Sequence, residues 1–242
     1  MFSKPLFIQS FKSNKMVWTV VTAVMCLMLL QFQALKNDTM NLTSTLFYGM
    51  MSMMISTLYV VITANKLLAS QVDSGSMAYV LSTPIKRGAV AFTQAMFLVG
   101  SLFVTFAFTT IVHLVTNAIF HSDAFTVGSV FALNLGSFVL AATLGGICFM
   151  FSGIFNLSKT SLGTGGMISV WFMLATMLGM FSTIGLEALK IFKYTTITTL
   201  FDSESIMAGT TAWLWKLAIL CLIGVGTYVA GSVAFSKKNL PL

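Results

Sequence analysis

The sequence predicts an all-α, polytopic membrane protein with six transmembrane helices and both termini in the cytoplasm. Three observations indicate this: the composition, the lengths of the uncharged runs, and the positions of the basic residues. Of the 242 residues, 57% are hydrophobic and only 8% are charged, and the mean hydropathy is +0.93. An ordinary soluble domain carries about 25% charged residues, so this composition excludes a soluble protein.

Charged residues divide the chain into six apolar runs, each near or above the roughly 20 residues that cross a bilayer. The runs are 16–35, 39–65, 88–112, 124–158, 160–186 and 217–236. The fourth is long but too short for two crossings and a turn, so we expect one helix there. The first is followed by polar residues without a small-residue cleavage pattern, so we expect a span and not a signal peptide. We therefore expect a single membrane domain over 1–242.

The basic residues predict the orientation, because cytoplasmic segments carry an excess of Lys and Arg. With the N-terminus inside, nine of the 13 basic residues face the cytoplasm: Lys4, Lys12, Lys15, Lys66, Lys86, Arg87, Lys159, Lys237 and Lys238. The outer side keeps Lys36, Lys190, Lys193 and Lys216, with every acidic residue except Asp73. The net charge of +7 then reflects topology and contact with anionic membrane lipid. It does not indicate nucleic-acid binding.

Two segments outside the spans are expected to contact the membrane surface. In 1–15, the residues Phe7, Ile8 and Phe11 share a helical face, which favours an interfacial helix; the alternative is a charged flank that only fixes topology. The extracellular loop 187–215 alternates apolar and polar residues. It is expected to hold short re-entrant helices, with Trp213 and Trp215 at the headgroup level; the alternative is a solvated loop.

Few side chains inside the spans could take part in catalysis or proton transfer, because no Asp, Glu, Lys or Arg lies well within a run. Such a residue costs about 2.5–3.5 kcal/mol at membrane depth and is kept for function. His113 and His121 are expected at the outer interface, not as proton relays. Cys26, Cys148 and Cys221 lack metal-ligand spacing and are expected to be small buried residues. We expect no catalytic residue, metal or cofactor in this chain.

A few residues within the spans are candidates for the substrate path or for helix packing. Asn134 is a polar candidate for the path, with an interhelical hydrogen bond as the alternative. Met53 belongs to a methionine cluster that would give an adaptable surface, with ordinary packing as the alternative. Small residues four apart allow close helix approach, and we expect packing within the subunit, with dimerisation as the alternative. The pairs are Ala141 with Gly145, Ala142 with Gly146, and Gly226 with Ala230.

A nucleotide-binding loop is excluded. The segment 153–160 reads "GIFNLSKT", which is similar to the phosphate-binding pattern G-x-x-x-x-G-K-[ST]. That loop needs its second glycine so that backbone N–H groups can surround the phosphates, and it follows a β-strand. Here Ser158 replaces this glycine, and the segment ends a membrane helix.

The cytoplasmic loop 66–87 contains "QVDSGSMAYVLSTPIKR". This pattern predicts a short helix. Asp73 or Ser74 would cap its start, and Pro84 would end it. Its apolar face, displayed to the cytoplasm, would consist of Met77, Val80 and Leu81 beside Tyr79. A two-turn helix is marginal alone in water, so we expect it to dock in a groove of a partner protein.

This loop resembles the first cytoplasmic loop of ABC-2 type transporter permeases, the type V exporter class. There an acidic residue precedes Gly and Thr or Ser, and a "LLSTP" segment and a basic residue follow. The matching residues are Asp73, Gly75, Ser76, Leu81, Ser82, Thr83, Pro84 and Arg87. The tail "FSKKNLPL" resembles the ending of the family, with Asn239 where Asp is more usual. "TLFDSESIMAG" is similar to its segment before the last span.

The resemblance implies a permease subunit of the bacterial plasma membrane with no ATPase of its own. Two such subunits, identical or paralogous, would pair around a pathway. An ATP-binding cassette ATPase, which binds the ATP and Mg, would dock on each. The residues that it assigns to ATPase coupling are Asp73, Gly75, Ser76, Met77, Tyr79, Val80, Leu81, Pro84 and Arg87.

The expected cargo is amphipathic or hydrophobic, because the spans carry no charge. An antimicrobial or cytolytic peptide, or a drug, is the leading expectation. The alternatives are export of a lipid, a glycolipid or sodium, a stand-alone channel or secondary carrier, and an intramembrane enzyme.

Overall fold

The structure is a computed structural model that describes residues 2–35, 42–120, 125–181, 189, 191–192 and 195–239. Within these residues the chain is helical and has no β-strand. The part described contains six helical segments long and apolar enough to cross a membrane: Lys4–Ala34, Leu42–Asp73, Arg87–Phe120, Val127–Ile154, Ser158–Gly179 and Ala212–Lys237. The predicted six-span helical architecture is confirmed, including a single helix for the fourth run.

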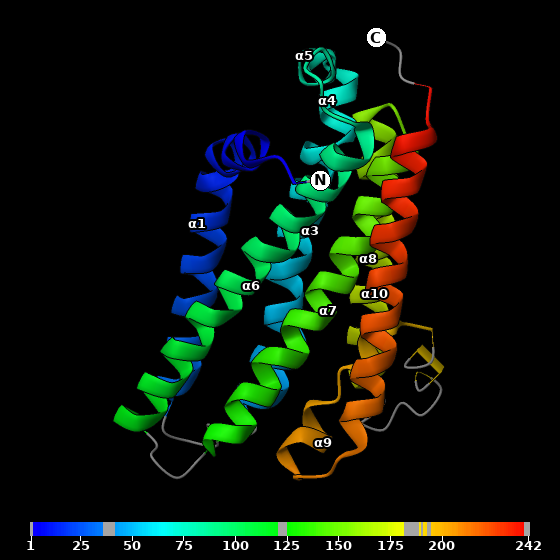
Figure 1. Cartoon of the computed structure of the whole chain (residues 1–242). Helices are drawn as coiled ribbons and strands as arrows, with labels where there is room; N and C mark the ends of the chain where they lie inside the picture. Colours follow the sequence, from blue (N-terminus) through cyan, green and yellow to red (C-terminus); the bar gives the residue numbers. More distant parts are fainter. Residues whose placement is uncertain are drawn as a thin grey trace.

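The long helices run side by side, with short helices at both ends of the bundle (Figure 1). In chain order they are α1 (Lys4–Ala34), the π-helix η1 (Leu42–Met51), α3 (Ser52–Leu67), α4 (Ala69–Asp73), α5 (Ser76–Leu81), α6 (Arg87–Phe120), α7 (Val127–Ile154), α8 (Ser158–Phe181), the 3-10 helix η4 (Ile197–Leu200), α9 (Ser203–Met207) and α10 (Ala212–Lys237). The start of α1 and the end of α10 lie at the end of the bundle that carries α4 and α5 (Figure 1).

The nine basic residues assigned to the cytoplasm all lie at this end, which we call the basic end. They occupy the start of α1, the end of α3, the starts of α6 and α8, and the end of α10. Asp73 is the one acidic residue that the described part of the chain places there. Lys216, Asp202 and Glu204 lie at the opposite end, around α9. The charge asymmetry is therefore a property of the fold, and the cytoplasmic location of the basic end stays a prediction.

Helix α7 is central and contacts α3, α6, α8 and α10. Its contact with α10 depends on glycine, because a Cβ on Gly153 would lie 2.4 Å from the Gly231 carbonyl oxygen and one on Gly231 would lie 2.8 Å from the Met150 Cα. Gly146 faces α10 as expected from its spacing with Ala142. Gly226 faces open space, and Gly224 and Gly231 make the contact. Packing of Gly226 within the chain is therefore not found, and its use in a dimer stays a prediction.

The predicted interfacial helix is continuous with the first span, because α1 begins at Lys4. Its N-terminal part lies across the basic end, and the rest runs along the bundle (Figure 1). Leu6, Ser10 and Asn14 are buried, and Ser10 Oγ donates a hydrogen bond to Gln94 Oε1 at 2.7 Å. Ser10 and Asn14 also donate to α1 carbonyls one turn earlier. Such side-chain bonds accompany bends in helices.

The face predicted for lipid contact is only partly exposed. Ile8 and Phe11 are exposed, whereas the Phe7 ring packs against Phe97, with ring centroids 5.7 Å apart. Contact of this segment with the membrane surface stays a prediction.

The opposite end is closed by η4 and α9. Asp202 caps α9 by accepting a hydrogen bond from Ser205 N at 2.9 Å, and it pairs with Lys216 Nζ at 2.5 Å. Burial alone would raise the pKa of Asp202, but the hydrogen bonds from Lys216 and Ser205 lower it below the ordinary 3.8. The re-entrant helices stay a prediction, and residues 187–188, 190 and 193–194 of that loop, like His121, lie outside the described part.

Candidate functional site

The predicted coupling loop folds into two short helices, α4 and α5, separated by a glycine turn. Gly75 has φ +72, in the left-handed region that glycine adopts without steric cost. It is the N-cap residue of α5. The predicted cap at Asp73 or Ser74 is therefore wrong. The cause is that Asp73 ends α4 and that its carboxylate is bound to another helix.

Asp73 joins the loop to α8. Its Oδ2 accepts a hydrogen bond from the backbone N of Ser158 at 3.1 Å, and Asn65 Nδ2 donates to Ser158 Oγ at 2.8 Å. A carboxylate at a helix N-terminus is favourable because it satisfies a free N–H and faces the positive end of the helix dipole. Nearby, Ala69 N donates to Ser152 Oγ of α7 at 2.9 Å. The loop is thus fixed to the α7–α8 connection.

The predicted apolar patch of α5 faces the bundle and not the solvent. Met77 is 0% exposed, and Val80 and Leu81 are half-buried against the same core. The helical spacing was correct, but the apolar face packs on the protein's own basic end. The predicted display of this face to the cytoplasm is therefore wrong.

The outward surface of the loop is formed by other residues. Tyr79 is 82% exposed. We call this region the Tyr79 surface, and its exposed residues are Ser74, Gly75, Ser76, Tyr79, Ser82, Thr83 and Pro84. Ser82 Oγ donates to the Tyr79 carbonyl at 2.8 Å and Thr83 Oγ1 to the Val80 carbonyl at 2.6 Å, so both hydroxyls satisfy carbonyls at the end of α5. The result is a rigid surface with one exposed aromatic ring.

Arg87 is bound within the chain. Its Nη1 donates to the Lys238 carbonyl at 2.8 Å, and Lys238 Nζ donates to the Phe155 carbonyl at 2.5 Å and the Gly153 carbonyl at 3.3 Å. Burial lowers the pKa of Lys238 to about 8, whereas the two carbonyls at the end of α7 favour its charged form. These contacts join α6, α7 and the tail, and the sequence reasoning missed them.

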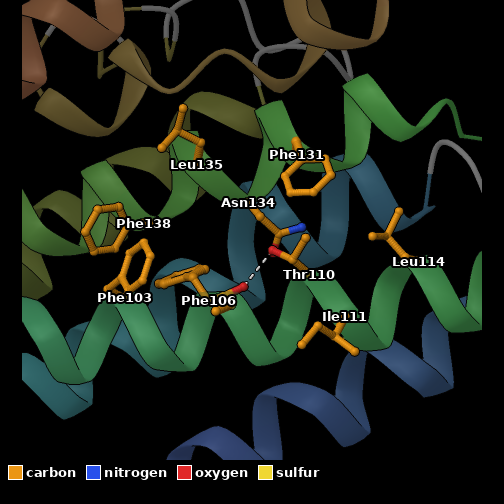
Figure 2. Close-up of a pocket in the computed structure, with 10 residues that line it drawn as sticks. Phe103, Phe106, Thr110, Ile111, Leu114, Phe131, Asn134, Leu135 and Phe138 are labelled. Atoms are coloured by element: carbon orange, nitrogen blue, oxygen red, sulfur yellow. Dashed lines mark hydrogen bonds between the residues drawn. The ribbon is translucent and has the colours of Figure 1, made fainter.

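Asn134 forms interhelical hydrogen bonds, which is the alternative that the sequence left open. Its Nδ2 donates to Tyr48 Oη of η1 at 2.8 Å, and its Oδ1 accepts from Thr109 Oγ1 of α6 at 3.0 Å. Asn134 also lines a cavity of about 310 Å³ between α6 and α7. The walls of this cavity are largely apolar and include four phenylalanines (Figure 2): Phe103, Phe106, Phe131 and Phe138.

His113 is buried within the bundle, at 0% exposed, and its expected position at the outer membrane interface stays a prediction. Helix α6 continues to Phe120, so His113 lies about two turns inside the helix end. Its Nδ1 lies 2.6 Å from Tyr48 Oη. Which of these two atoms donates depends on the tautomer of His113. His113 Nε2 has no partner within the part of the chain described.

We call Tyr48, Thr109, His113 and Asn134 the Tyr48 network. Nothing in the sequence marked Tyr48, which lies in an uncharged run like its neighbours. It is placed by η1, a π-helix of 10 residues. Such helices are rare and occur mostly as single turns, frequently at functional sites. The network connects three segments of the bundle by side-chain hydrogen bonds.

Met53 is buried and lines a different cavity, of about 280 Å³, together with Leu140, Thr176 and Asp202. The two substrate-path candidates, Asn134 and Met53, are therefore not brought together in one cavity.

The cysteines and the acidic residues form no further site. Cys148 is buried and Cys26 half-buried, but Cys221 is exposed, which contradicts its expected burial. Across the described residues there is no group of three His, Cys, Asp or Glu side chains that could hold a metal ion.

Comparison with known proteins gives no relative, since neither a family model nor a curated protein matches the chain.

Proposed function

We propose that this chain is the membrane-spanning permease subunit of an ATP-driven exporter of the ABC-2 type, powered by a separate ATPase. The observation that carries the proposal is the Tyr79 surface. It is a short, rigid element at the basic end, exposed on one face and packed on the membrane helices by the other. Such an element can receive a movement from a partner and pass it to the spans.

Three sets of contacts would transmit that movement. Met77 inserts from α5 into the core, Asp73 binds the start of α8, and Arg87 binds the tail that reaches the end of α7. The exposed Tyr79 ring would be the anchor in a pocket of the ATPase, since aromatic residues dominate such contacts. Displacement of α5 would then shift α6 and α8 together.

An amphipathic or hydrophobic cargo, such as a cytolytic peptide or a drug, fits the spans best. The cavity lined by Asn134 has largely apolar walls, and the polar atoms of Asn134 are bound within the protein. Export of a lipid or glycolipid is the second candidate, favoured by the same walls. Sodium export has less support, because the described spans hold no buried carboxylate. The proposed location is the bacterial plasma membrane.

Pairing of two subunits belongs to the same proposal. Helices α1, α8 and α10 bury the smallest share of their residues within the chain, so their outer faces are open to lipid or to a second permease, identical or paralogous. The ATP and Mg would be bound by the ATPase.

The test first looks for a gene beside this one that encodes a Walker-type ATPase, and then co-expresses the two chains, purifies the pair and reconstitutes it in liposomes. ATP hydrolysis and uptake of a labelled amphipathic peptide would be measured for wild type, Tyr79→Ala and Tyr79→Phe. We expect Tyr79→Ala to weaken ATPase binding about tenfold or more and Tyr79→Phe to retain it. Ile119→Ala, at an exposed position of the opposite end, is the matched control. Transport without any ATPase, or equal binding by all variants, would contradict the proposal.

A further inference from the structure

A cavity of about 420 Å³ lies at the basic end, between the start of α1 and the start of α6. Its lining includes Phe2, Lys4, Ile85 and Lys86. Ser3 N donates a hydrogen bond to Thr93 Oγ1 of α6 at 3.1 Å, which holds the start of the chain against α6. The cavity is therefore built by two segments that are far apart in sequence, and it shares only Pro84 with the Tyr79 surface.

Among the described residues, the cavity presents positive charge and no acidic side chain lines it. Lys4 and Lys86 are both exposed, and the ion pair found among the described residues, Lys216 with Asp202, lies at the opposite end of the bundle. The acid of the basic end, Asp73, is bound to Ser158 N. Arg87, next to the cavity, is bound to the Lys238 carbonyl.

Two helix N-termini add to this charge. Lys4 is the first residue of α1, and the Lys86 carbonyl accepts the first hydrogen bonds of α6, from Ala89 N at 2.8 Å and Val90 N at 3.2 Å. The N-terminus of a helix carries partial positive charge and free N–H groups, which favour anions. Two lysines and two helix starts converge on one cavity, so the ligand that it fits is an anion.

Exposed apolar residues of the cavity and of the two helices that begin there indicate what else the ligand carries. Phe2, in the cavity lining, is 50% exposed. Within the first three turns of these helices, Ile8 and Phe11 of α1 and Phe92 and Met96 of α6 are also exposed. A free phosphate would use only the lysines, whereas a phospholipid would place its phosphate on them and its acyl chains along these residues.

We propose that this cavity binds the headgroup of an anionic phospholipid, with Lys4 and Lys86 on the phosphate. Occupancy would fix the start of α1 to the start of α6, and so connect the lipid composition of that leaflet to the first span. This inference does not depend on the exporter proposal, because it concerns lipid and needs no ATPase.

The experiment titrates the purified full chain in detergent with phosphatidylglycerol or phosphatidylcholine and counts bound lipids by native mass spectrometry. Lys4→Gln with Lys86→Gln is compared with Lys12→Gln with Lys15→Gln. The second pair removes the same charge from exposed positions of the same end. We expect phosphatidylglycerol to bind the first variant about 30-fold more weakly, roughly fivefold for each lysine near an anionic surface, and the second variant within about twofold of wild type.

Further variants and ligands show what the cavity binds and whether each variant is folded. Lys4→Arg with Lys86→Arg should retain binding, and all variants should unfold within about 2 °C of wild type, because both lysines are exposed surface residues. Equal loss in both glutamine pairs would show diffuse surface attraction and overturn the proposal. So would equal binding of phosphatidylcholine, or displacement of the lipid by millimolar inorganic phosphate. If the glutamine pair does not fold, Lys86→Gln alone is the variant to compare with Lys15→Gln.

Discussion

The Asp73 carboxylate accepts a hydrogen bond from the Ser158 backbone N–H at 3.1 Å and so caps a helix that begins far from it in the sequence. The contact joins the loop that carries the Tyr79 surface to the start of α8. A carboxylate is well suited here, because the first N–H groups of a helix have no partner within the helix.

We expect Asp73→Ala to lower the free energy of unfolding by about 1 kcal/mol, the usual cost of losing a helix cap. Asp73→Asn should cost less, since its amide oxygen can still accept the bond. Thermal unfolding in detergent measures the loss, and amide hydrogen exchange at 158–161 should rise in the alanine variant. Ser74→Ala, at the next position, is the control. Equal effects of Asp73→Ala and Ser74→Ala would show that the contact is not stabilising.

Met77 and Tyr79 lie on opposite faces of α5 and should respond in opposite ways. Met77 is 0% and Tyr79 82% exposed. We expect Met77→Ala to reduce stability by about 2–5 kcal/mol, as for other buried side chains, and Tyr79→Ala to change it by less than about 0.5 kcal/mol. Thermal unfolding distinguishes the two. If Tyr79→Ala proved the more destabilising, α5 would pack the other way round.

The spans were predictable because a charged side chain is costly in hydrocarbon, so the uncharged runs mark the membrane segments directly. Their ends were less predictable, because a helix can continue beyond the apolar run. Helix α6 extends to Phe120, and this places His113 inside the bundle. Helix α1 begins at Lys4, so the expected interfacial helix and the first span form one element.

The packing could not be predicted, because spacing along a helix shows which residues share a face and not what that face contacts. Met77 and its neighbours were correctly grouped, yet they pack on the protein itself. Gly226 and Gly224 are equally small, and an apolar membrane helix has no polar face that would distinguish them. The Tyr48–His113 hydrogen bond joins positions whose pairing depends on the tertiary structure alone.

The close contact of α7 and α10 predicts strong sensitivity at two glycines. A Cβ on Gly153 would lie 2.4 Å from the Gly231 carbonyl oxygen, which is part of the backbone and cannot rotate away. We expect Gly153→Ala or Gly231→Ala to cost about 1–3 kcal/mol or more through overpacking.

The matched control is Gly226→Ala, on the side of α10 that faces open space. Gly226→Ala should be neutral or should stabilise the protein by up to about 1 kcal/mol, because alanine has a higher helix propensity than glycine. Thermal unfolding of the three variants decides the matter. Equal stability of Gly153→Ala and Gly226→Ala would mean that the two helices lie farther apart.

The Tyr48 network predicts different results for two Tyr→Phe substitutions. Tyr48→Phe removes the hydroxyl that both Asn134 and His113 use. It leaves His113 Nδ1 without its partner and Asn134 Nδ2 with only its bond to the Val130 carbonyl. The expected loss of stability is about 1–3 kcal/mol. The Tyr228 hydroxyl is buried without a hydrogen-bond partner in the described part, so Tyr228→Phe should be neutral or stabilising. Chemical denaturation of both variants in detergent tests this. An equal loss for the two would mean that the network is not formed.

The Asp202–Lys216 ion pair predicts a stability that depends on pH. The pKa of Asp202 in the folded protein lies below 3.8, so the unfolded chain binds a proton at higher pH than the folded chain does. The stabilisation that the Asp202 carboxylate gives to the folded protein is therefore complete above about pH 5, and it is lost as the pH falls through the pKa of the folded protein. Asp202→Asn mimics the protonated side chain: it keeps the amide oxygen for the Ser205 N–H and loses the charge that attracts Lys216.

We expect wild type to exceed Asp202→Asn in stability by about 0.5–1 kcal/mol at pH 7, a typical value for a partly exposed pair. The difference should shrink below pH 4 as the wild-type carboxyl becomes protonated. Thermal unfolding between pH 3 and pH 7 measures it. Glu204→Gln removes the same charge at an exposed neighbouring position and should show little difference from wild type at any pH. A constant difference between wild type and Asp202→Asn would mean that hydrogen-bond geometry, and not charge, stabilises this end of the bundle.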